Sequence, residues 1–179
     1  MKLNLKNHIS IAEQIVDGSL IIKTVAEFRS ILKIFPNNPA LQKVFSEMLL
    51  RQKHRDEAAR SYAKAAQLFI EAGKFLQVID CKLLQWRIKP PTPKEARTFY
   101  VNLQKGNFSD TPLNTFFQRL SYPELISLVA RLNHQNLTEG KLIKKAGDPE
   151  NNLYLVVSGE LKETVFLPLQ KNKDTHYRK

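Results

Sequence analysis

The chain is poor in cysteine, and this limits its chemistry. Cys81 is the single cysteine among 179 residues, so no intrachain disulfide and no cysteine-based metal site can form. No window approaches the roughly 18 apolar residues of a membrane span. Residues 1–6 are basic but lack the apolar core of a secretory signal. These absences predict a cytoplasmic protein with no membrane partner.

Acidic residues are also few. Seventeen Asp and Glu against 28 Lys and Arg give a formal net charge of +11, most of it in residues 1–107. Such a charge is typical of nucleic-acid-binding proteins, and that is the alternative function of this chain. However, aromatic residues do not interleave with the one local cluster as single-strand binding requires, so a solvated surface is favoured. The cluster comprises Arg51, Lys53, His54 and Arg55, followed by Arg60 and Lys64.

Signatures of catalysis are missing as well. The four histidines lie in separate segments without metal-ligand spacing. Asp80 beside Cys81 is expected to raise the pKa of the thiol, which disfavours a thiolate nucleophile. Asp148 and Glu150 are both acidic but fall in a predicted turn, and no phosphate loop or nucleophile elbow is present. We therefore expect no catalytic, metal or cofactor site.

Helical periodicity dominates residues 10–105. Ser10 to Glu13 and Thr92 to Glu95 have the pattern of capping boxes, and Pro39 follows a capping Asn38. Glycines such as Gly18 and Gly73 are placed to end helices. Apolar stripes at three- and four-residue spacing predict six helices, with stripes near 11–16, 20–35, 39–49, 58–69, 76–86 and 93–103.

Equivalent apolar positions recur every 34 residues, which indicates an internal repeat. The recurring sets are Ile11, Phe45 and Ile79; Ile15, Leu49 and Leu83; Phe28 and Tyr62; Ile31 and Ala65. The central unit resembles the tetratricopeptide repeat family, a helix–turn–helix of this length. It departs from the family pattern at Gln42, Ser46 and Ile70. Three degenerate units are predicted, and a helical bundle without repeats is the alternative.

The resemblance to tetratricopeptide repeats implies a concave surface lined by the first helix of each unit. In the middle unit this surface presents Lys43, Glu47, Leu50 and Arg51. A protein or peptide partner on that groove is one expectation. A packing platform without a peptide ligand is the other.

Composition changes after residue 107. A short linker is followed by two predicted helices, at 113–120 and 121–132. Three glycines then punctuate residues 137–162, where the apolar runs at 142–143 and 153–157 are predicted to be strands joined by tight turns.

The spacing in that stretch resembles the opening half of the cyclic-nucleotide-binding domain family. The residues concerned are Gly140, Ile143, Gly147, Asp148, Tyr154, Val156, Gly159 and Leu161. The run 116–132 is similar to the lead-in helices of that family. The resemblance implies a β-roll shaped by these glycines. Nothing after Gly159 resembles the family's phosphate-binding cassette, so a cyclic nucleotide is expected only if a longer chain completes the roll.

Together these features predict a mainly α fold with a small β part: an α–α superhelix of tetratricopeptide-like hairpins plus a partial antiparallel β-roll. The predicted domains are 1–107 and 112–179. The expected function is that of a non-enzymatic regulatory or scaffold protein. If the chain is truncated, an open β edge is expected to favour self-association.

Overall fold

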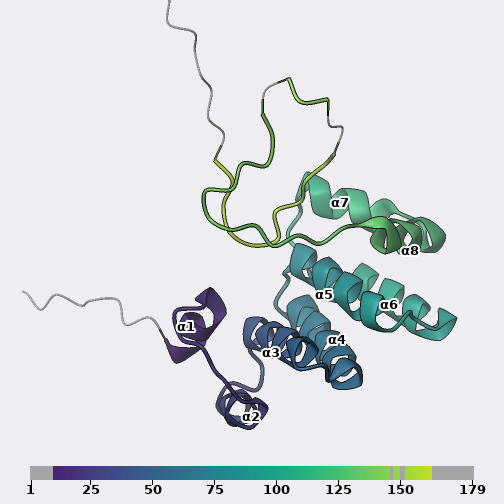
Figure 1. Cartoon of the computed structure of the whole chain (residues 1–179). Helices are drawn as coiled ribbons and strands as arrows, with labels where there is room; N and C mark the ends of the chain where they lie inside the picture. Colours follow the sequence, from purple (N-terminus) through teal and green to yellow (C-terminus); the bar gives the residue numbers. More distant parts are fainter. Residues whose placement is uncertain (1–9, 146, 150–151, 163–179) are drawn as a thin grey trace, which may run out of the picture.

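The structure is a computed structural model that describes residues 10–145, 147–149 and 152–162. Over these residues it contains eight α-helices and no β-strand (Figure 1). The helices are α1 (Ile11–Asp17), α2 (Val25–Ile34), α3 (Pro39–Arg51), α4 (Arg55–Glu71), α5 (Phe75–Ile88), α6 (Pro93–Lys105), α7 (Pro112–Arg119) and α8 (Tyr122–Arg131). The mainly α character predicted from the periodicity is confirmed.

Side-chain caps set most of the helix starts. Ser10 and Thr92 form the predicted capping boxes, and the Asn38 side chain accepts from the Leu41 amide while Pro39 occupies the first turn of α3. α2 begins later than predicted, at Val25 instead of near residue 20. The reason is a capping box at Thr24, which fixes the helix start there and leaves 20–23 outside it.

α3, α4 and α5 form the centre of the molecule, one beside the next (Figure 1). Turns of three residues join α3 to α4 and α4 to α5, so consecutive helices are antiparallel. Ala58, Ala65 and Ala66 on α4 are fully buried. Because alanine carries only a methyl group, neighbouring helices can approach α4 closely on this face.

Positions related by 34 residues share the same environment. Phe45 and Ile79 are buried, as are Leu49 and Leu83. Phe28 and Tyr62 are both at most 2% exposed. The recurrence therefore marks positions that face the core of successive helices. Ile11 is the exception, with 56% of its surface exposed.

Two hydrophobic clusters fill the interior. The first joins α1, α2, α3 and the start of α4, where the rings of Phe28 and Phe45 lie 5.3 Å apart. The second joins α4 to α8, and in it Phe75 packs on Phe117, with ring centroids 5.3 Å apart. Residues on both sides of the predicted 107–112 linker thus share one core.

The prediction of a partial antiparallel β-roll is wrong for the described residues. The run 152–156 has no strand partner, and Leu142 and Leu153 are 62% and 85% exposed. A β-ladder needs a second strand and an apolar face to pack on, and even a two-stranded hairpin is marginally stable by itself. The β-type residues are present here, but neither condition is met.

The turn chemistry in the same stretch is right. Gly147 has φ of +89°, and Asp148 accepts a hydrogen bond from the Lys145 amide through its side chain, 2.7 Å away. Glycine supplies the left-handed backbone and aspartate caps the turn, as the sequence indicated. The turns therefore form without the strands that they were predicted to join.

Candidate functional site

One face of α5 holds a returning segment of the same chain. Gln77, Asp80 and Arg87 are spaced three and seven residues apart, which places them along a single helix face. Residues 132–134 and Val157 contact this face through hydrogen bonds. In Figure 1 this segment, green to yellow, leaves α8 and runs back past the start of α5.

A buried carboxylate lies at the middle of the face. Asp80 is 3% exposed. Its Oδ1 lies 2.6 Å from Nδ1 of His134, and its Oδ2 lies 2.7 Å from Nζ of Lys43 on α3. Glu47, one turn along α3, lies 3.9 Å from the same ammonium. Asp80 therefore joins α3, α5 and the segment after α8.

The pKa shifts in this cluster favour its charged forms. Burial by itself would raise the pKa of Asp80, but the hydrogen bond from His134 and the charge of Lys43 outweigh it, and the net pKa is lowered. The hydrogen bond to Asp80 raises the pKa of His134 despite partial burial. Burial opposes the charge on Lys43, yet Asp80 raises the pKa of that ammonium overall. A carboxylate held between two cationic groups is the state that these shifts favour.

Two of the other contacts on the face are to main-chain carbonyl oxygens, and one is to a side chain. Gln77 donates from Nε2 to the carbonyl oxygen of Val157, 2.8 Å away. Arg87 donates to the carbonyl oxygen of Leu132 and to the Asn133 side chain, each at 3.0 Å. Leu155 packs against the second core cluster. The face thus holds a non-helical stretch of backbone by hydrogen bonds that do not depend on most of the side chains of that stretch.

Two of the departures from the repeat pattern, Gln42 and Ser46, form a separate polar group with Ser61 between α3 and α4. Gln42 donates from Nε2 to Oγ of Ser61 at 2.6 Å, and Ser46 donates to the same oxygen at 2.8 Å. All three residues are buried. Oε1 of Gln42 has no hydrogen-bond partner among the described residues. This group fixes the pairing of the two helices and does not open to the α5 face.

Cys81 is buried beside Asp80, and burial raises the pKa of its thiol to about 12. The predicted direction is confirmed, although burial contributes more than Asp80 does. No hydrogen bond to His134 is formed by Cys81 within the described part of the chain. The His–Asp pair consequently has no thiolate to activate. No group of three His, Cys, Asp or Glu side chains suited to a metal ion occurs in the described residues.

The predicted groove residues divide between the site and its surroundings. Lys43 and Glu47 belong to the Asp80 cluster. Leu50 packs against the first core cluster, and Arg51 is exposed at the end of α3. The basic cluster that follows, from Arg51 to Arg55, is exposed around the turn between α3 and α4.

The residues of the predicted roll lie in the segment after α8. Gly140, Gly147 and Gly159 have positive φ, Ile143 is half-buried, and Asp148 caps a turn. Tyr154 and Val156 are 38% and 41% exposed. Val157, a neighbour of these residues, accepts a hydrogen bond from Gln77 on the α5 face, and Leu155 packs against the second core cluster.

Sequence reasoning missed Asp80, His134, Gln77 and Arg87 as parts of one site. A signal existed for Asp80, which stands 34 residues after Ser46 and so at a repeat position that is buried. A carboxylate at such a position requires a partner. No comparable feature of the sequence indicates that His134, 54 residues away, supplies it.

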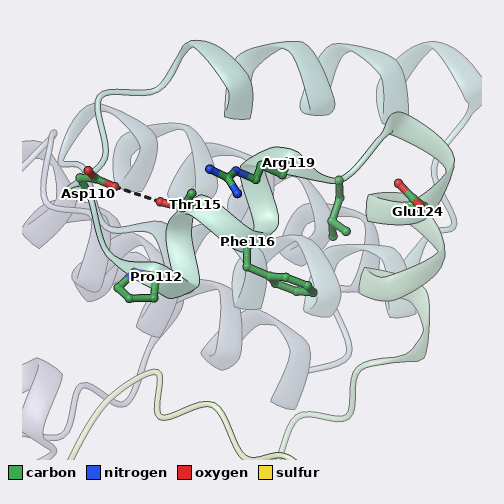
Figure 2. Close-up of a pocket in the computed structure, with 7 residues that line it drawn as sticks. Asp110, Pro112, Thr115, Phe116, Arg119 and Glu124 are labelled. Carbon is green, nitrogen blue, oxygen red and sulfur yellow. Dashed lines mark hydrogen bonds between the residues drawn. The ribbon is translucent and has the colours of Figure 1, made fainter.

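A surface depression lies beside α7, and it is lined in part by Asp110, Thr115, Phe116, Arg119 and Glu124 (Figure 2). Its carboxylates are already engaged. Asp110 accepts from Oγ1 of Thr115 at 2.9 Å, and Glu124 accepts from the Ser121 amide at 2.8 Å to cap α8. Both carboxylates stabilise the starts of helices. They are therefore not directed at a common point where they could bind a ligand.

Comparison with models of known protein families gives no match. Neither the curated proteins nor the solved structures include a significant match to the chain. Among the described helices, none combines the length and the hydropathy of a bilayer-spanning segment.

Proposed function

We propose that this protein is a non-enzymatic helical platform that binds an extended peptide segment of a partner protein along α5. The observation that carries the proposal is the grip of Gln77 and Arg87 on the carbonyl oxygens of Val157 and Leu132. A surface that holds non-helical backbone in this way can accept a peptide of similar conformation. The partner sequence is then selected mainly at Asp80.

The repeat pattern supports the same function. The 34-residue recurrence and the buried alanines of α4 favour tetratricopeptide-like hairpins, in which the first helix of each unit lines the concave surface. α3 and α5 are the first helices of two such units, and Lys43 and Asp80 meet between them at 2.7 Å. A scaffold role follows from this arrangement, because the cluster offers recognition but no nucleophile.

The test is a selection of random dodecapeptides displayed on phage against two full-length chains, the wild type and His134→Glu. The second chain places a carboxylate beside Asp80 and so weakens the hold of the returning segment. Selected peptides should bind at least one chain, and Gln77→Leu should weaken that binding about fivefold because one hydrogen bond is lost. Gln67→Leu, an exposed change on α4, is the matched control and should have no effect.

If the selection yields no specific peptide on either chain, the proposed function is overturned. It is also overturned if the changes at Gln77 and Gln67 lower peptide binding equally, because binding would then not involve the α5 face.

A second candidate function is nucleic-acid binding. The exposed basic cluster at the turn between α3 and α4, with a net charge of +11, favours it. A gel-shift titration with duplex and single-stranded DNA at two salt concentrations separates the two functions. Phosphate contacts predict a steep loss of affinity with salt, and an absence of binding at low salt would remove this candidate.

A further inference from the structure

We propose that the segment after α8 occupies the peptide-binding face of its own chain through residues 132–134 and Val157, and that a partner segment with a cationic side chain in the place of His134 displaces it. This inference rests on the proposed function and names its regulation and its ligand class. The ligand class is an extended peptide with a Lys, Arg or protonated His residue that reaches Asp80.

The cationic requirement follows from the position of Asp80. Its carboxylate is 3% exposed, and His134 is the donor that approaches Oδ1. When the segment leaves, that oxygen loses its donor, and an unmet buried carboxylate oxygen costs free energy. A competing segment therefore binds well only if it supplies a replacement donor, and a cation supplies the strongest one. Lys43 stays in place because it belongs to α3.

The segment buries little apolar surface, which makes displacement possible. Its contacts with α5 include the hydrogen bonds of residues 132–134 and of Val157, and Leu155 packs against the second core cluster. Several of its large apolar side chains remain exposed: Leu137, Leu142, Leu153, Tyr154 and Val156. A tail that served only to complete the core would bury these groups. Segments with little buried apolar surface open at low free-energy cost.

Attachment in cis still gives the segment an advantage. A tethered ligand competes at an effective concentration of about millimolar for short flexible connections. A free peptide with the same sequence consequently binds the wild-type chain poorly. It gains access once the tethered copy is weakened.

The experiment uses the full-length chain and a fluorescein-labelled synthetic peptide of residues 130–160, followed by fluorescence anisotropy. Three chains are compared: the wild type, His134→Glu and Gln135→Glu. The last is the matched control, because it adds the same charge at an exposed neighbouring position. The peptide should bind His134→Glu at least about tenfold more tightly than it binds the other two chains, the factor expected for a difference of about 1.4 kcal/mol.

Hydrogen exchange gives an independent measurement on the same chains. Amides of residues 133–136 should exchange about tenfold faster in His134→Glu than in Gln135→Glu, while amides of α3 to α5 stay equally protected in both chains. Equal exchange in the two variants would contradict occupation of the face through His134. Loss of protection in α3 to α5 would show a folding defect. Release of the segment from the α5 face is then measured with Gln77→Leu instead.

The ligand class is tested with two changed peptides on the His134→Glu chain. A peptide carrying lysine for His134 should bind more tightly than one carrying leucine there, and adding Asp80→Asn to the chain should remove the difference. Equal binding of both peptides would overturn the cationic requirement. Equal binding of the 130–160 peptide to all three chains would overturn occupation in cis but leave the proposed function standing, whereas failure of the phage selection overturns the function itself.

Discussion

The α3–α5 stack and the segment 132–162 contain similar apolar residues but bury them to very different extents. Leu49 in α3 is fully buried, whereas Leu153 in the segment is 85% exposed. Both lie in apolar runs for which the sequence predicts regular secondary structure. The difference is that leucines in the stack face a neighbouring helix at each turn, whereas Leu153 faces none.

Backbone hydrogen bonding accounts for the contrast. A helix satisfies its own amides and carbonyls, and therefore forms as soon as one face finds a partner. An extended run satisfies its backbone only against another chain segment or water. In this molecule, Gln77 of α5 donates one such hydrogen bond to the carbonyl oxygen of Val157, in the run from 152 to 157.

The largest expected effect tests this contrast with one residue type. Leu49→Ala should lower the free energy of unfolding by about 2–5 kcal/mol, the range for leucine in a close-packed core. Leu153→Ala should change it by less than about 0.5 kcal/mol, as for other exposed positions. Urea denaturation followed by circular dichroism measures both. A similar loss in both variants would mean that Leu153 has a partner in solution.

An intermediate effect is expected at a helix start. Thr92→Ala removes the side chain that accepts from the Glu95 amide at the start of α6, and should cost about 1 kcal/mol of stability. Thr138→Ala is the same change in the exposed part of the segment and should cost less than about 0.5 kcal/mol. Thermal unfolding of the two full-length variants measures the difference. Equal costs would show that the segment contains capped structure of its own.

The smallest expected effect is the pH dependence of the segment's attachment. The pKa of His134 is raised, so its contribution is complete below its ordinary pKa of about 6.5 and is lost as the pH rises through the raised value. The pKa of Asp80 is lowered, so its contribution is present above about 3.9 and is lost as the pH falls through the lowered value. Attachment should be strongest between these limits.

The groups that face the pair are Lys43 and Glu47 from α3 and Asn136 from the segment, and Lys43 keeps its charge because its pKa is raised. Between pH 6 and pH 9, exchange at residues 133–136, corrected for the intrinsic rate, should increase, because His134 loses its proton as the pH rises through its raised pKa. The variant His134→Asn should lose this dependence. An unchanged pH profile in that variant would assign the dependence to another group.

How much of this could be predicted depended on the range of the interactions. Capping at Ser10, Asn38 and Thr92 involves residues three positions apart, and all three predictions are confirmed. The predicted start of α2 is wrong because a capping box at Thr24 sets the helix start against the apolar periodicity. The strand prediction at 153–157 was wrong because strand formation depends on a partner that residue types do not specify.

The candidate site was harder to predict for the same reason. Lys43 and Glu47 were placed on the concave surface from repeat register, and both lie at the Asp80 cluster. His134 was not predicted to be a site residue, because it has no metal-ligand spacing to another such residue in the sequence. Only the return of the chain along α5 brings it to Asp80.

By itself, the sequence determined the positions of most helices and their buried faces, because helix hydrogen bonds and caps are local and apolar spacing records the face. It also determined the tight turns at the glycines. Tertiary structure alone decided that the described residues after α8 form no strand, and that Asp80 meets both His134 and Lys43. Those outcomes depend on which surfaces come together in space, and charge pairing across 54 residues leaves no periodic trace in the chain.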